Sequence, residues 1–176
     1  MLIGTLVYVV TTSGARADPV VLTERPEHVT EAVAVVDAPP AEVYALATDY
    51  ARWPKTLSDV TSAKIESGGR RDAKVRFRSK ALGHEVAVVF DNDPDRALRF
   101  HSVDAPPGAS ARGEYILQPI DGGRRTRIRA TLYLHVSGIP GIFMNAAKVR
   151  SMRRIKLEHD LADTARWFGA NRGNAA

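Results

Sequence analysis

Beyond residue 60 the chain alternates between apolar and polar residues with a period of two. In Arg124–Ser137, for example, Ile128 and Leu132 fall on one face, whereas Arg127 and Arg129 fall on the other. This alternation predicts antiparallel strands that bury one face and expose the other to water. Strands are expected at Thr30–Asp37, Thr61–Ser67, Ala73–Lys80, His84–Asn92, Arg96–Val103, Ala109–Ile120 and Arg124–Ser137.

The segment between the first two of these strands has helical spacing instead. Val43, Leu46 and Ala47 recur at i, i+3 and i+4, which predicts a short amphipathic helix. Pro54 ends or bends this helix, because the residue before a proline disfavours helical geometry. A second short helix is expected over residues 54–57.

The C-terminal part of the chain favours one long helix. Residues Ile142–Phe168 are rich in alanine, leucine, methionine, lysine and glutamate, all good helix formers. At about 1.5 Å per residue, this helix is long enough to cross a sheet. Residues that repeat at three- and four-residue steps are expected to face the sheet, namely Met152, Ile155, His159 and Ala162.

The predicted order is one strand, two short helices, six further strands and one long helix. A curved seven-stranded antiparallel sheet can bury its apolar face by wrapping around the long helix. We therefore expect an α+β domain over residues 30–168, followed by a polar, flexible tail at 169–176.

The helical segment after the first strand carries a family resemblance. Residues 38–54 read APPAEVYALATDYARWP, and this segment resembles the opening of the START/Bet v 1-like (SRPBCC) superfamily. The most similar branch is the bacterial polyketide cyclase/dehydrase and lipid-transport group, and the element order fits over most of the chain. The resemblance implies a helix-grip fold with a deep apolar cavity. Members bind lipids, sterols, quinones, polyketides or hormones, and some catalyse cyclisation, but no universal catalytic residue comes with the motif.

Inward-facing strand residues and two methionines of the long helix are the candidates for lining such a cavity. Small-molecule pockets have mostly apolar walls, and methionine suits an adaptable wall. The alternative is that the same side chains fill a solid core. The candidates are Val75, Phe77, Val86, Val88, Phe90, Leu98, Phe100, Tyr115, Leu117, Ile128, Leu132, Leu134, Met144 and Met152.

Few residues could supply acid–base chemistry in this cavity. The candidates are Tyr115, Glu114 and His84, and the first two are neighbours in a strand, so only one of them can face inward. The chain has no cysteine, and its five histidines do not converge with carboxylates, so we expect no metal site and no cofactor. A binding protein is therefore favoured over an enzyme. The alternative is a polyketide cyclase/dehydrase-like enzyme that uses a polar group of the same cavity.

The first residues have the pattern of an export signal. An apolar run at 2–10 is followed by a polar stretch that ends in Ala15-Arg16-Ala17, and the run is too short to span a bilayer. We expect cleavage after Ala17, an arm at 18–29 and a periplasmic or secreted protein. No Lys or Arg precedes the run, and its β-propensity also allows a buried N-terminal strand. In that case the protein is cytoplasmic.

Basic residues exceed acidic residues, 25 to 20, and they concentrate on the long helix. One interpretation is a solvated helix face, and the other is docking on an anionic membrane beside the apolar loop 137–143. Nucleic acid is not expected, because aromatic residues do not interleave with the basic ones. The expected partner is a hydrophobic small molecule or lipid, with transient contact to an anionic membrane. The docking candidates are Lys148, Arg150, Arg153, Arg154 and Lys156.

Overall fold

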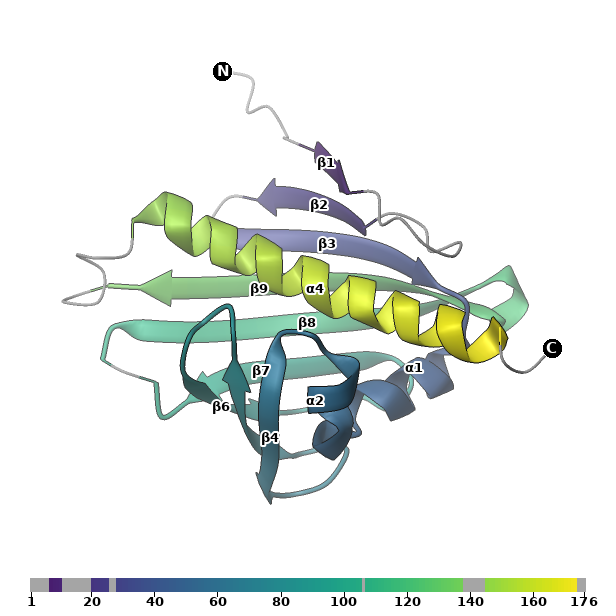
Figure 1. Cartoon of the computed structure of the whole chain (residues 1–176), viewed down its shortest axis with the longest axis horizontal. Helices are drawn as coiled ribbons and strands as arrows, with labels where there is room; N and C mark the ends of the chain where they lie inside the picture. The colour runs from purple at the N-terminus through teal and green to yellow at the C-terminus, as the bar shows by residue number, and fades with distance from the viewer. Residues whose placement is uncertain (1–6, 11–19, 26–27, 106, 138–144, 174–176) are drawn as a thin grey trace.

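A nine-stranded sheet curves around one long helix, α4 (Ala146–Gly173), in the computed structural model (Figure 1). The structure describes residues 7–10, 20–25, 28–105, 107–137 and 145–173. Every neighbouring pair of strands is antiparallel, in the order β1-β2-β3-β9-β8-β7-β6-β5-β4. This arrangement confirms the expected α+β helix-grip fold. Among the described residues, no helix combines the length and the apolar character needed to cross a membrane.

The elements follow the expected order, with two strands more than the seven predicted. The strands are β1 (Val7–Val10), β2 (Val20–Arg25), β3 (Val29–Val36), β4 (Val60–Ser67), β5 (Lys74–Ser79), β6 (Glu85–Phe90), β7 (Ala97–Val103), β8 (Ala109–Ile120) and β9 (Arg125–Val136). The remaining elements are the helices α1 (Pro40–Ala47) and α2 (Trp53–Thr56) and the 3-10 turns η1 (Tyr50–Arg52) and η2 (Asp121–Gly123). The seven predicted strands are β3 to β9.

The two additional strands extend the sheet at its N-terminal edge. β2 pairs with β3 although it lies in the expected arm, and β1 pairs with β2 although it lies in the expected leader. Cleavage after Ala17 would remove β1 and leave β2 as the edge strand, and this cleavage stays a prediction. At the other end of the chain, residues 169–173 continue α4 where a flexible tail was expected.

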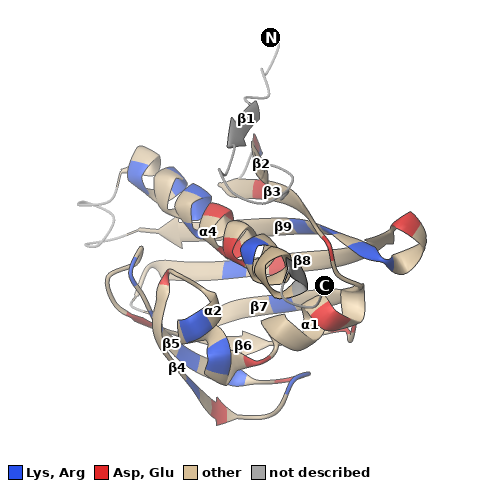
Figure 2. Ribbon diagram, turned by 45° about the vertical axis from the view of Figure 1, so that its right-hand side comes forward, with Lys and Arg blue, Asp and Glu red and all other residues tan. Residues whose placement is uncertain are grey.

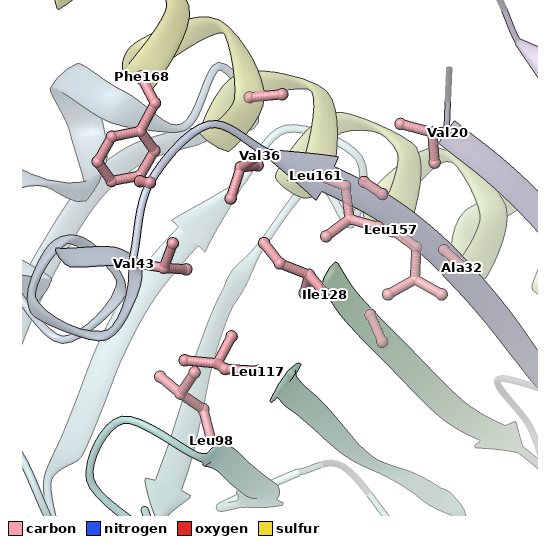
Figure 3. Packing of buried hydrophobic residues seen from close by; sticks show 14 of the residues in the cluster. Val20, Ala32, Val36, Val43, Leu98, Leu117, Ile128, Leu157, Leu161 and Phe168 are labelled. Carbon is pink, nitrogen blue, oxygen red and sulfur yellow. The ribbon is translucent and has the colours of Figure 1, made fainter. Parts of the chain in front are cut away.

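Two hydrophobic clusters fill the space inside the curved sheet. The larger cluster joins β2, β3, β8 and β9 to α4, and Leu157 and Leu161 of α4 are almost fully buried in it (Figure 3). The smaller cluster joins η1 to β4, β5 and β6 around Tyr50. Phe100 packs against both clusters.

The face of α4 that meets the sheet differs from the predicted stripe. Ile155 is 39% exposed and His159 is exposed, so the prediction is wrong at these two positions. Leu157 and Leu161 are buried instead. The spacing of apolar residues indicates the wrong face of the helix, because the buried face also carries three charged side chains, Arg153, Asp160 and Asp163.

Arg153 connects α4 to the additional strand β2. Its side chain is 3% exposed, its Nε donates to Thr30 Oγ1 at 2.9 Å, and its Nη2 pairs with Glu24 at 3.2 Å. Thr30 Oγ1 donates in turn to Glu24 at 3.0 Å. The prediction that Arg153 belongs to a docking surface is therefore wrong, because its guanidinium lies inside the domain.

Candidate functional site

A cavity of about 150 Å³ lies between the sheet and α4, closed at one side by α1 and α2. The structure places most of the predicted lining residues on its wall. Alternate residues of a strand point to the same face of the sheet, so the strand pattern correctly identified those that point inward. Val75 is the exception, since it is fully buried in the smaller cluster, and Met144 lies outside the described residues. The predicted residues on the wall are Phe77, Val86, Val88, Phe90, Leu98, Phe100, Tyr115, Leu117, Ile128, Leu132, Leu134 and Met152.

Part of the wall comes from residues that the strand pattern could not reveal. The segment between β3 and β4 contributes Val43, Leu46, Ala47, Trp53, Thr56 and Leu57. The signal was present in the spacing of Val43, Leu46 and Ala47, which places these residues on one apolar face of α1.

The aromatic residues after α1 build an end wall of packed rings. The rings of Tyr50 and Trp53 lie 5.2 Å apart, and Trp53 meets Phe77 and Phe90 edge-on at 5.5 and 5.9 Å. Such edge-to-face pairs add stability beyond their buried area. The Trp53 indole N–H donates to the Ala47 carbonyl at 2.9 Å, which fixes the ring. The sequence TDYARWP thus closes the cavity with packed rings.

Tyr50 lies behind this wall and is only 1% exposed. Its phenol donates to the carbonyl of Arg70 at 3.4 Å, and Asn92 Nδ2 donates to the Tyr50 oxygen at 3.0 Å. Burial disfavours the phenolate and raises the pKa of Tyr50 to about 12.

This raised pKa predicts a loss of stability at alkaline pH. A tyrosine in the unfolded chain ionises near 10, so the folded protein holds the Tyr50 proton more tightly between pH 10 and 12. The free energy of unfolding should fall across this window, approaching about 1.4 kcal/mol per pH unit from this group. Urea unfolding at pH 9, 10, 11 and 12 measures the slope, and Tyr50→Phe should make it shallower. Equal slopes in both proteins would contradict the assignment.

Three polar side chains stand out on the otherwise apolar wall. Tyr115 Oη donates to Asp160 Oδ2 at 2.7 Å, and Lys156 Nζ donates to Asp160 Oδ1 and Oδ2 at 2.5 and 2.6 Å. Burial and the neighbouring Asp160 carboxylate raise the pKa of Tyr115 well above its usual value. We refer to Tyr115, Asp160 and Lys156 as the polar trio.

Comparison with known proteins decides the family. Residues 27–166 match the family model described as polyketide cyclase / dehydrase and lipid transport, and this match includes the motif at 38–54. The chain belongs to this family. Its membership agrees with the resemblance that the motif indicated. No curated protein sequence matches the chain.

Solved structures show the family's fold at low sequence identity. Zhui aromatase/cyclase from Streptomyces sp. R1128 superimposes with a TM-score of 0.64 at 19% identity, covering 78% of this chain and 90% of that one. A START superfamily protein from Mycobacterium smegmatis gives 0.63 at 13% identity, covering 80% and 97%. The di-domain aromatase/cyclase BexL of the BE-7585A pathway gives 0.63 at 22% identity, covering 78% of this chain and 45% of BexL. The chain thus spans less than half of BexL.

The position of each acid–base candidate decides whether it can act in the cavity. Tyr115 faces the cavity, whereas its neighbour Glu114 lies on the outer face of the sheet and pairs with Arg99 at 2.7 Å. His84 is exposed in the turn before β6, with Nδ1 2.7 Å from the Leu82 carbonyl oxygen. Glu114 and His84 are therefore wrong as cavity residues. Within the described ranges, no three His, Asp or Glu side chains converge as a metal site requires.

The basic residues of α4 separate into two sets. Lys148 and Arg150 are exposed and Arg154 is partly exposed near the N-terminal end of the helix (Figure 2). Lys156, however, lines the cavity, so its assignment to the docking surface is wrong. The reason is that α4 presents the line Met152, Lys156, Asp160 and Thr164 to the cavity at four-residue steps.

Proposed function

We propose that this protein binds a compact hydrophobic molecule in the cavity between the sheet and α4 and carries it. The observation that supports this proposal is the wall itself, which is apolar over nearly its whole surface and carries one cluster of charged groups. Ligand pockets have this composition, in which apolar area supplies affinity and a few polar groups set orientation. Membership in a family described by cyclase/dehydrase activity and lipid transport is consistent with such a ligand.

The size of the cavity limits the ligand. A cavity volume of about 150 Å³ compares with that of an engineered protein cavity that holds a single benzene ring. The conformation described therefore fits a molecule of about one ring. A longer ligand would require the segment 53–57 or the turn at Leu82 to move outward, because both border the cavity.

Our proposal places this carrier outside the cytoplasm, in transient contact with an anionic membrane. The leader pattern at residues 2–17 supports export, and the exposed Lys148 and Arg150 with the partly exposed Arg154 on α4 support the contact. N-terminal sequencing of the periplasmic or secreted protein should begin at Asp18. Recovery of intact Met1 in the cytosol would contradict export without affecting the cavity.

Ligand binding can be tested on the purified protein. Native mass spectrometry should show a mass above that of the polypeptide, and organic extraction should release one hydrophobic compound. The molecule should leave on denaturation, because the folded wall holds it. Protein of bare polypeptide mass that binds no hydrophobic compound on titration would overturn the proposal.

A second candidate is an enzyme related to the aromatase/cyclases that share the fold. The polar trio favours it, because Tyr115 and Lys156 both carry transferable protons next to the cavity. Incubation with a linear polyketone should then yield a cyclised product, and Tyr115→Phe should abolish turnover while the polyketone still binds. Unchanged turnover in Tyr115→Phe would exclude Tyr115 from this chemistry.

A further inference from the structure

Hydrogen-bond donors on the cavity wall are almost all used inside the protein. The hydroxyl of Thr164 donates to the Asp160 carbonyl at 2.7 Å, and that of Thr56 donates to the Arg52 carbonyl at 3.3 Å. The indole of Trp53 is equally occupied, as is the phenol of Tyr115. A ligand entering the cavity finds these four donors engaged.

Lys156 is different, because an ammonium group has three N–H donors. Among the described residues, Lys156 Nζ donates to the two oxygens of Asp160, so one N–H remains for another acceptor. The side chain is 17% exposed and borders the cavity. A donor on a charged nitrogen makes a stronger hydrogen bond than a neutral one.

The charges of the polar trio cancel. Lys156 carries one positive charge, Asp160 carries one negative charge, and the Tyr115 phenol stays neutral. A carboxylate or phosphate brought beside Lys156 would also lie beside Asp160, so it would lose its hydration without a net opposite charge. A carbonyl or hydroxyl oxygen has a much smaller desolvation cost and can accept the remaining N–H.

We propose that Lys156, held in place by Asp160, anchors one neutral oxygen acceptor of the ligand, and that the site selects ketones, quinones or alcohols over carboxylates and phosphates. This inference rests on the proposed binding function and names the chemical class that the cavity takes. Tyr115 is a positioning residue, since its hydrogen bond orients the Asp160 carboxylate that holds Lys156.

Three probes with one ring and different head groups test the selection: ethylbenzene, acetophenone and benzoate. Each is titrated into the labelled full chain and followed by NMR shifts of wall residues such as Val88 and Leu132. Lys156→Met keeps the aliphatic stem and removes the donor. Acetophenone affinity should fall about tenfold in this variant, whereas ethylbenzene affinity should change less than about twofold.

Asp160→Asn supplies the opposite test. The variant leaves the Lys156 charge without its partner, so benzoate affinity should rise about tenfold while ethylbenzene affinity stays unchanged. Lys64→Met is the matched control, because Lys64 is an exposed lysine on β4 away from the cavity. It should reproduce the wild-type affinities. The double variant Lys156→Met/Asp160→Asn removes both charges and keeps the test available if Lys156→Met fails to fold.

The outcomes separate the anchor from the proposed function. Suppose that ethylbenzene and acetophenone both bind the wild-type protein. If Lys156→Met and the double variant then weaken the binding of both probes equally, or of neither, the anchor is wrong and the binding function stands. If benzoate affinity does not rise in Asp160→Asn, the charge argument is wrong. If no probe shifts the wall residues and no ligand co-purifies, the binding function fails and the anchor fails with it.

Discussion

Ala111→Trp is expected to abolish ligand binding, with a loss of affinity of at least about tenfold. Ala111 lies on β8 and borders the cavity, so an indole at this position projects into the space that the ligand occupies. Overpacking of this kind costs about 1–3 kcal/mol of stability in a filled core. The cost should be at the low end here, because the cavity receives the ring and Ala111 is only partly buried. Native mass spectrometry and acetophenone titration measure the loss.

Ser110→Trp is the matched control for this experiment. Ser110 is the preceding residue of β8, it is exposed, and its side chain points to the other face of the sheet. The control protein should keep its co-purified ligand and its affinity. Ala111→Trp protein that still carries ligand would show that the ligand binds elsewhere.

Glu24→Ala is expected to lower the free energy of unfolding by about 3 kcal/mol. The substitution leaves the buried guanidinium of Arg153 without its carboxylate, and among the described residues Thr30 is the remaining side-chain partner. Removing one member of a buried ion pair is costly because the other charge stays desolvated. Urea unfolding at neutral pH measures the change.

Two further variants identify the cause. Glu24→Leu/Arg153→Met replaces the pair by apolar side chains and should recover most of the lost stability, because no unpaired charge remains. Glu114→Ala breaks the partly exposed pair with Arg99 and should cost no more than about 1 kcal/mol. If Glu24→Ala costs no more than Glu114→Ala, Arg153 does not depend on its carboxylate.

The sequence predicts the strands well because most of them have one apolar face. Alternation is a local property, so neighbouring positions alone predict β3 to β9. The same alternation predicts that residues such as Phe77 and Leu132 point inward. β2 was missed because it is short and lies next to two prolines in a segment that reads as an arm. Its strand character depends on pairing with β3.

The buried face of α4 could not be predicted from its sequence. Arg153 and Asp160 are buried because they meet Glu24 and Tyr115, which lie 129 and 45 residues away along the chain. A hydrophobicity pattern assigns such charges to solvent and shifts the predicted face accordingly. Of the polar trio, the sequence therefore predicts only Tyr115 as a cavity residue, and it places Lys156 on the wrong surface.

The meeting of β2 and α4 in one hydrophobic cluster also sets when the chain can fold. Val20 and Leu22, near the start of the described domain, share this cluster with Leu157 and Leu161, near its end. Contacts of such high sequence separation raise the contact order and slow folding, because a long loop must close before they form. A nascent chain cannot complete this core until α4 has emerged from the ribosome, so the N-terminal strand β2 has to wait for the last helix of the domain before its apolar face is covered.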